Sequence, residues 1–177
     1  MKSFEIGGSR LELVQGDITK QETEAVVNAA NKRLAPGGGV AGAIHRAAGP
    51  ELYEECKKLD GCETGDAKIT EGYELPADHV IHTVGPVYSG TEKDERDLRS
   101  SYRSSLELAL ENEIKSISFP SISTGAFGYT TDEAAEIALD EIKSFLEDNE
   151  GIELVRMVLY SQDDYELYLE KAEKIYS

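Results

Sequence analysis

Hydrophobic and polar positions form two patterns along this chain, one typical of strands and one typical of helices, and the two patterns alternate. Short apolar runs bounded by turn residues predict buried strands at residues 10–15, 25–28, 67–73, 79–84, 116–120 and 154–160. Stripes with helical spacing predict amphipathic helices at residues 40–58, 95–112, 132–147 and 163–176. Strands that alternate with helices are typical of an α/β domain built in layers.

Two positions refine the predicted helices. Gly49-Pro50 interrupts the first helical stretch, so we expect one helix to end there and a second to begin. Thr131 stands before the third stretch as a plausible N-cap. There is no internal repeat, low-complexity segment or evident linker, so we expect residues 1–177 to form a single domain.

The charge of the chain narrows the choice of partner. With 18 basic and 35 acidic residues, the formal net charge is −17, which argues against broad contact with nucleic acid backbones. No apolar run is long enough to span a bilayer, and the first residues lack the apolar core of a signal peptide, so we expect a cytoplasmic monomer that does not bind membranes. Cys56 and Cys62 form neither a disulfide framework nor a zinc motif, and we expect no metal and no cofactor.

Residues suited to binding a nucleotide-type ligand follow the predicted strands. Asn28 and Asn31 close the second strand, and asparagine amides can donate to and accept from sugar hydroxyls. Gly37–Gly39 then opens a helix, whose free N–H groups suit a phosphate. The glycine run is neither a Walker motif nor a convincing dinucleotide fingerprint. A second loop, from Ser121 to Tyr129, repeats the arrangement after another apolar run.

Several phrases occurring in order identify a family. They are Gly16-Asp17-Ile18-Thr19, Val27-Asn28-Ala29-Ala30-Asn31, Gly37-Gly38-Gly39-Val40, Gly42-Ala43-Ile44-His45-Arg46-Ala47-Ala48-Gly49, His82-Thr83-Val84-Gly85-Pro86-Val87-Tyr88 and Ser123-Thr124-Gly125. Together they resemble the macrodomain family, in particular its MacroD-like ADP-ribose hydrolases, over nearly the whole chain. The resemblance implies a three-layer α/β/α sandwich around a mixed sheet of about six strands.

The resemblance also implies roles for individual residues. Asp17 would accept from the adenine amino group while the N–H of Ile18 meets the ring, although a turn or cap aspartate is the alternative. Asn31 would orient the distal ribose as a catalytic contact, and Asn28 would share that role while partly bracing the loop. Tyr160 would stack on adenine, unless it only packs at its strand end.

The two loops would hold the pyrophosphate. The resemblance assigns this binding to Gly37, Gly38, Gly39 and Val40 on one side. On the other side, main-chain donors and hydroxyls would wrap it, with Phe127 and Tyr129 flanking the distal ribose; packing in the core is an equal alternative for Phe127. The residues implied there are Ser123, Thr124, Gly125, Ala126, Phe127, Gly128 and Tyr129.

One position departs from the pattern. MacroD-like hydrolases commonly carry an aspartate where this chain has Ala41, and that aspartate helps to activate water. Three functions therefore stay open. The first is hydrolysis of an ester at the distal ribose, on O-acetyl-ADP-ribose or on ADP-ribosylated Asp or Glu of a protein. The others are a reader that binds ADP-ribose without turnover and a phosphatase for ADP-ribose 1″-phosphate.

Overall fold

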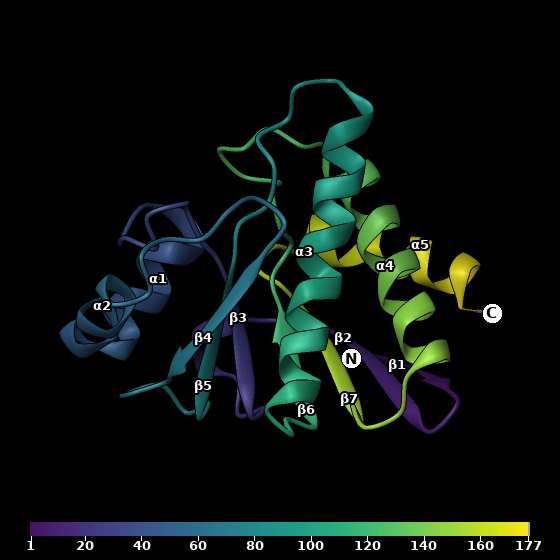
Figure 1. Ribbon diagram of the computed structural model, residues 1–177. Coiled ribbons are helices and arrows are strands. Elements are labelled where there is room, and N and C mark those ends of the chain that lie inside the picture. Colours follow the sequence, from purple (N-terminus) through teal and green to yellow (C-terminus); the bar gives the residue numbers. More distant parts are fainter. Residues whose placement is uncertain (177) are drawn as a thin grey trace.

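A computed structural model describes residues 1–176 and shows one sheet with helices on both faces (Figure 1). The sheet has the order β1-β2-β7-β6-β3-β5-β4. Its strands are β1 (Lys2–Ile6), β2 (Ser9–Gln15), β3 (Ala25–Ala29), β4 (Ala67–Glu71), β5 (His79–Thr83), β6 (Ser116–Phe119) and β7 (Leu154–Leu159). The helices are the 3-10 turn η1 (Ile18–Lys20), α1 (Gly39–Ala48), α2 (Pro50–Lys57), α3 (Glu92–Glu111), α4 (Thr131–Asp148) and α5 (Gln162–Ile175).

The sheet is mixed, and the predicted three-layer class is confirmed. The inner strands β2, β7, β6, β3 and β5 run parallel, whereas β1 and β4 pair antiparallel at the two edges. The sheet has seven strands rather than about six, because Lys2–Ile6 forms a hairpin with β2. This edge strand is mostly exposed and therefore lacks the apolar run that marks the buried strands.

Most predicted boundaries hold to within a few residues. The break at Gly49-Pro50 is confirmed: α1 ends at Ala48, and Pro50 opens α2. Gly49 has φ of +90°, a backbone conformation that residues with a side chain rarely adopt and glycine adopts readily. The predicted cap of α4 is wrong by one residue. Thr130 is the N-cap and its side chain accepts from the N–H of Glu133 at 3.3 Å, while Thr131 is the first helical residue.

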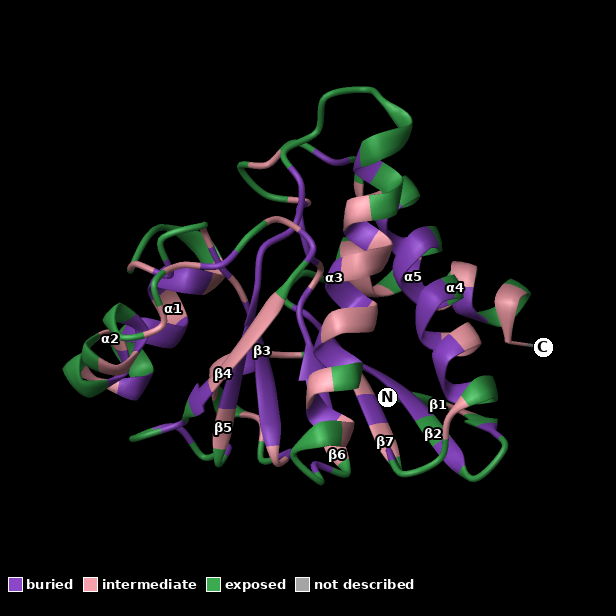
Figure 2. Cartoon of the chain, viewed as in Figure 1, coloured by how far each residue is buried: buried purple, intermediate pink, exposed green. Residues whose placement is uncertain are grey.

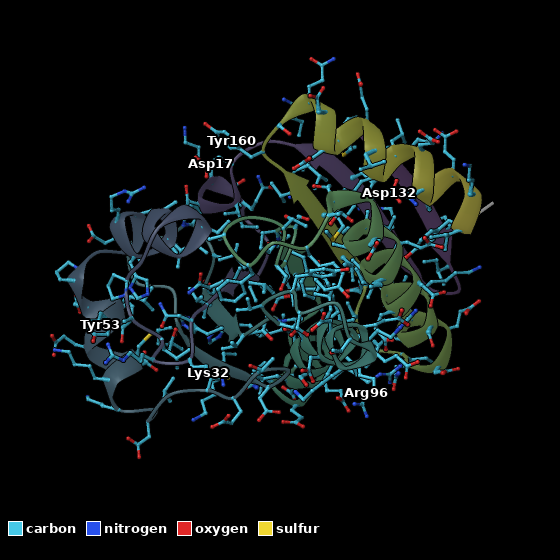
Figure 3. All side chains as sticks on the ribbon, turned by 90° about the horizontal axis from the view of Figure 1, so that it is seen from above. Asp17, Lys32, Tyr53, Arg96, Asp132 and Tyr160 are labelled. Atoms are coloured by element: carbon cyan, nitrogen blue, oxygen red, sulfur yellow. The ribbon has the colours of Figure 1, made fainter. Side chains whose placement is uncertain are left out.

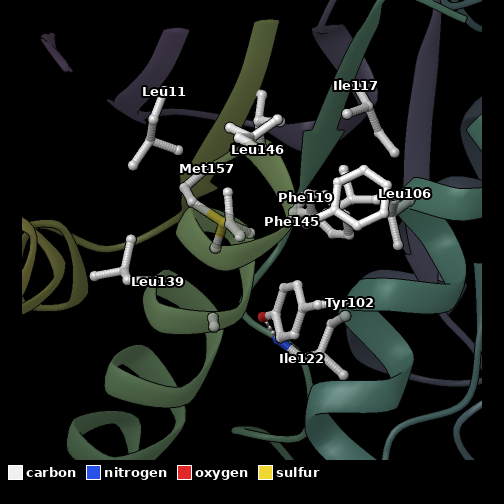
Figure 4. Close-up of a cluster of buried hydrophobic side chains, with 14 of the residues drawn as sticks. Leu11, Tyr102, Leu106, Ile117, Phe119, Ile122, Leu139, Phe145, Leu146 and Met157 are labelled. Carbon is white, nitrogen blue, oxygen red and sulfur yellow. Dashed lines mark hydrogen bonds between the residues drawn. The ribbon is translucent and has the colours of Figure 1, made fainter. Parts of the chain in front are cut away.

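Each face of the sheet carries its own apolar core, because successive strand residues point to opposite faces. Val27 and Ile81 belong to the larger core, which also holds buried residues of α3, α4 and α5. Figure 4 shows part of it, including the hydroxyl of Tyr102, which accepts from the N–H of Ile122 at 3.2 Å. Val26 and Val80 belong to the smaller core with residues of α1 and α2. Figure 2 shows the burial concentrated on the strands and on the inward sides of the helices.

The parallel strands place the candidate site. Their carboxyl ends meet at one edge of the sheet, where ligands gather in open α/β folds. The segments that lead into α3 and α4 rise at this edge, at the top of Figure 1. Within residues 1–176, no helix is both long and apolar enough to cross a membrane.

Candidate functional site

A cleft of about 300 Å³ opens where β3, β5 and β6 end. One wall is the glycine loop with the first turn of α1, and the opposite wall is the segment that follows β6. The residues that line it are Ala29, Ala30, Asn31, Gly37, Gly38, Gly39, Val40, Ala41, Gly85, Ser121, Ile122, Ser123, Gly125, Ala126 and Phe127. None of these side chains is ionisable, so main-chain groups dominate the chemistry of the cleft.

The glycine wall presents free amides to this cleft. The N–H groups of Gly37 and Gly38 donate to no acceptor within residues 1–176. Gly38 is the N-cap of α1, and the first N–H groups of a helix have no intrahelical acceptor. A Cβ on Gly38 would meet no protein atom within 4 Å, whereas one on Gly42 would overlap the carbonyl oxygen of Gly37. Gly42 therefore lets the loop pack on the helix, and Gly38 leaves space for a ligand.

The opposite wall also offers main-chain donors. The amides of Gly125, Ala126 and Phe127 have no acceptor among the described residues. The hydroxyls are engaged elsewhere: Ser123 Oγ donates to the carbonyl of Pro86 at 2.8 Å, and Thr124 Oγ1 donates to Ser121 Oγ at 3.0 Å. These two hydroxyls are thus bonded within the protein, and the open donors of this wall belong to the backbone. Facing amides from two loops form a cradle for an anion.

Asn31 lies at the cleft and also braces its own loop. Its Oδ1 accepts from the N–H groups of Arg33 and Ala35, each at 3.1 Å, and its Nδ2 donates to the carbonyl of Ala35 at 2.9 Å. One N–H of the amide is left for a ligand. The side chain is therefore held in place before a ligand arrives.

The two aromatic residues of the second loop, Phe127 and Tyr129, lie in different surroundings. Phe127 is half-buried and lines the cleft. Tyr129 is 5% exposed and packs in the larger core, with its ring 5.1 Å from that of Tyr88 in a T-shaped arrangement. Thr124, Gly128 and Tyr129 are absent from the cleft lining, so the structure brings only part of the predicted loop to the ligand space.

Asn28 lies beneath the cleft rather than in it. It is 1% exposed, and its Nδ2 lies 3.1 Å from His82 Nδ1. His82 Nε2 lies 2.9 Å from Thr70 Oγ1 and 3.8 Å from Cys56 Sγ. These contacts give Asn28 a bracing role, and the residue is absent from the cleft lining. The interior beside the sheet is thus polar at this point, next to Ala29 and Ala30 of the cleft lining.

Burial keeps His82 neutral. Its pKa falls to about 3 because burial disfavours the charged ring, with a smaller effect from nearby His45. Burial also lowers the pKa of His45, whose two ring nitrogens have no partner among the described residues. Both rings are therefore uncharged at neutral pH, and neither lines the cleft.

A second group of predicted residues lies at the ends of β2 and β7. The N–H of Gly16 donates to the carbonyl of Leu159 at 2.9 Å, which brings Asp17 and Tyr160 onto neighbouring loops (Figure 3). Tyr160 is 85% exposed, so its ring is open for stacking. Ile18 is buried in the smaller core, which leaves only its backbone to contact a ligand.

Asp17 is the N-cap of η1, which was the alternative to adenine binding, and one of its carboxylate oxygens has no partner in the described part of the protein. Oδ1 accepts from the hydroxyl of Thr19 at 2.7 Å and from its N–H at 2.9 Å. These two bonds hold the pKa of Asp17 below its usual value, and the bond from the Thr19 hydroxyl has the larger effect. Oδ2 accepts no hydrogen bond within residues 1–176, so capping and ligand binding are compatible in one carboxylate.

Some lining residues had no assigned role in the sequence. Ala29, Ala30 and Gly85 lie within the quoted phrases, Ser121 opens the second loop, and Gly85 stands two residues after the end of β5. A Cβ on Gly85 would overlap Ser123 Oγ, so this glycine permits the two loops to approach. Its place just past the carboxyl end of a predicted strand was the available signal. Among residues 1–176, no group of three or more potential metal ligands is gathered.

The comparisons with known proteins agree with this geometry. The family model described as Macro domain matches residues 27–138. The macrodomain of Oceanobacillus iheyensis, solved with ADP, has a TM-score of 0.95 and 46% identity, covering 98% of this chain and 95% of that one. The Trypanosoma brucei macrodomain in complex with ADP-ribose has a TM-score of 0.86 and 44% identity, covering 90% and 68%.

A curated relative carries a named activity. ADP-ribose glycohydrolase MACROD2 of Xenopus laevis is 50% identical over 170 residues, which are 94% of this chain. The chain spans only 41% of that protein's length. The matched family model, the relative and the shared fold lead to one conclusion: this chain belongs to the macrodomain family.

Proposed function

We propose that this protein binds ADP-ribose in the cleft and hydrolyses an ester at its distal ribose. The observation that carries the proposal is the pair of facing loops with unpaired amides at Gly37, Gly38 and Gly125–Phe127. They suit a pyrophosphate, whereas the net charge of −17 would repel it at long range. The relatives named for ADP-ribose support the choice of ligand.

The adenine and the distal ribose would be held by other residues around the cleft. Asp17 and Tyr160 would hold the adenine at the ends of β2 and β7, and Asn31 would orient the distal ribose. With Ala41 at the wall, no lining side chain can take a proton. A water held by the substrate's own phosphate would therefore attack the acyl carbon. The bond between the acyl carbon and the ribose oxygen breaks, the water oxygen leaves in the carboxylic acid, and a proton from the water passes to the ribose oxygen.

The substrates proposed are O-acetyl-ADP-ribose and proteins that carry ADP-ribose on Asp or Glu. Proximity and orientation can lower a barrier by several kcal/mol without a strong protein base. Ala41 specifically favours a second candidate, a reader that binds ADP-ribose without turnover, because it supplies no base.

The test is a calorimetric titration with ADP-ribose, NAD and ATP, followed by product analysis with O-acetyl-ADP-ribose. We expect ADP-ribose to bind tightest and acetate to be released slowly, with Ala41→Asp raising the rate. Equal or tighter binding of ATP would overturn the proposed ligand. Tight binding of ADP-ribose with no acetate released would favour the reader.

Asp17→Asn should weaken ADP-ribose binding about tenfold while leaving the fold intact. Asparagine keeps an oxygen for the Thr19 bonds, but its NH₂ would replace the open acceptor Oδ2 and face the adenine amino group. Loss of a buried hydrogen-bond partner costs about 1–3 kcal/mol. Calorimetry measures the affinity, and an unchanged melting temperature shows that the cap survives. Unaltered affinity would remove Asp17 from the site.

A further inference from the structure

A second hollow lies on the far side of the loop that walls the cleft. It is a groove of about 440 Å³ between α3, α4 and the end of α5. The groove residues are Glu95, Arg99, Tyr129, Glu133, Glu136, Ile137, Asp140 and Ile175. Tyr129 and Phe127 belong to one loop, and they face the groove and the cleft respectively.

The rim of this groove is acidic. Four carboxylates face a single guanidinium, that of Arg99, which pairs with Glu95 at 3.1 Å and with Asp140 at 2.7 Å. Lys171 lies 3.5 Å from Glu136. Glu133 forms no ion pair within residues 1–176. The rim therefore keeps a negative charge that its own cations do not cancel.

The floor combines apolar surface with one open polar atom. Ile137 and Ile175 supply the apolar atoms. Tyr129 is 5% exposed, yet its hydroxyl makes no hydrogen bond with any residue in the described part of the chain. Burial first, and then the carboxylates of Asp94, Glu133 and Glu95, raise its pKa to about 12, so the hydroxyl stays protonated. The ring is therefore mostly covered, while the hydroxyl oxygen, unpaired among the described residues, is open at the groove and free to accept from a ligand.

A lysine or arginine side chain fits this combination. Its methylene stem can cover Ile137 and Ile175 while its cationic head donates to the Tyr129 hydroxyl and the carboxylates. The groove also lies beside the cleft. The N–H of Tyr129 donates to Ser123 at 2.9 Å, and that of Tyr88 donates to Phe127 at 2.7 Å. A protein that reaches the cleft across this loop would also lie over the groove.

We propose that the groove binds a lysine- or arginine-bearing segment of the ADP-ribosylated protein, next to its modified residue. The inference rests on the proposed function, and it names a substrate class: acceptor proteins that are basic near the site of modification. The partner is a polypeptide rather than a free polyamine, because the groove shares a wall with the cleft.

The experiment uses two synthetic peptides of equal length, each with one ADP-ribosylated glutamate. One peptide carries lysines on both sides of the modified residue, and the other carries serines there. Affinity and turnover are measured for the wild type, for Glu133→Gln/Glu136→Gln and for Tyr129→Phe. Glu107→Gln/Glu150→Gln is the matched control, because it removes two exposed carboxylates away from the groove.

We expect the wild type to prefer the lysine peptide about five- to tenfold, the sum of a few exposed charge contacts. The preference should vanish in the Glu133/Glu136 variant, decrease in Tyr129→Phe and persist in the control. Equal affinity of the wild type for both peptides, or a preference that all variants keep, would overturn the proposal. So would spermine binding to the groove when an unmodified lysine peptide does not.

Failure of the proposed function would look different. If neither peptide is hydrolysed, the affinities still report on the groove. If ADP-ribose itself does not bind, neither modified peptide gains affinity over its unmodified form. Free ADP-ribose should bind the groove variants as it binds the wild type, which separates the two sites.

Discussion

Replacing Gly38 with glutamate is expected to lower the affinity for ADP-ribose about 100-fold or more while the fold stays intact. Gly38 has φ of −88° and ψ of −177°, an extended conformation that any residue can adopt. A Cβ there meets no protein atom within 4 Å, so the new side chain would occupy the ligand's space. Its carboxylate would also repel the pyrophosphate, since like charges about 4 Å apart interact by ~4 kcal/mol near a protein surface.

The matched control is Gly8→Glu. This substitution adds the same charge at a glycine that also has open space around it. Gly8 lies in the β1–β2 turn, however, and lines neither the cleft nor the groove. Calorimetric titration of both variants with ADP-ribose, together with their melting temperatures, separates local from global effects. Normal binding by a folded Gly38→Glu variant would place the pyrophosphate elsewhere. Equal losses in the two variants would reduce the effect to net charge.

Asn31→Ala is expected to lower turnover of O-acetyl-ADP-ribose about 100-fold, and to lower affinity for ADP-ribose much less. The reason is geometric: the amide would orient the reacting ribose, and a misplacement of about 1 Å can cost a factor of 100 in rate. Without a lining base at Ala41, the reaction would depend on this orientation more strongly. The measurement is single-turnover release of acetate, compared with the dissociation constant for ADP-ribose.

The structural role of Asn31 needs its own readout. The side chain makes three hydrogen bonds to its loop, so its removal also loosens residues 33–35. Asn31→Asp retains the oxygen that accepts from Arg33 and Ala35 and loses the donor. If orientation by the donor matters, Asn31→Asp should be slow as well, with affinity further reduced by its charge. Parallel losses of rate and affinity in Asn31→Ala would point to a loop that has merely lost its shape.

The sequence predicted the location of the site better than the contacts inside it. Gly37–Val40 and Gly125–Phe127 reach the cleft because they follow parallel strands, whose carboxyl ends necessarily meet. The strand β1 was not predicted, because an exposed edge strand carries no apolar run. These outcomes depend on local pattern and on sheet topology, which a sequence records well.

Side-chain direction depends instead on distant partners. Ser123 lines the cleft, but its hydroxyl donates to the carbonyl of Pro86, 37 residues earlier. Tyr129 packs against Tyr88, and Asn28 pairs with His82 across two strands. No local pattern records such choices, so hydroxyls and amides assigned to a ligand proved to be bonded within the protein.

The pair of Asn28 and His82 has a consequence for the pairing of β3 with β5. The two residues stand opposite each other in the ladder, and their neighbours Val27 and Ile81 point into the larger apolar core. A slip of one residue would turn one polar side chain into that core, at a cost of about 1–3 kcal/mol for each unpaired group. The pair therefore selects a single register. That register in turn fixes the offset between Asn31 and Gly85 at the mouth of the cleft, before any ligand binds.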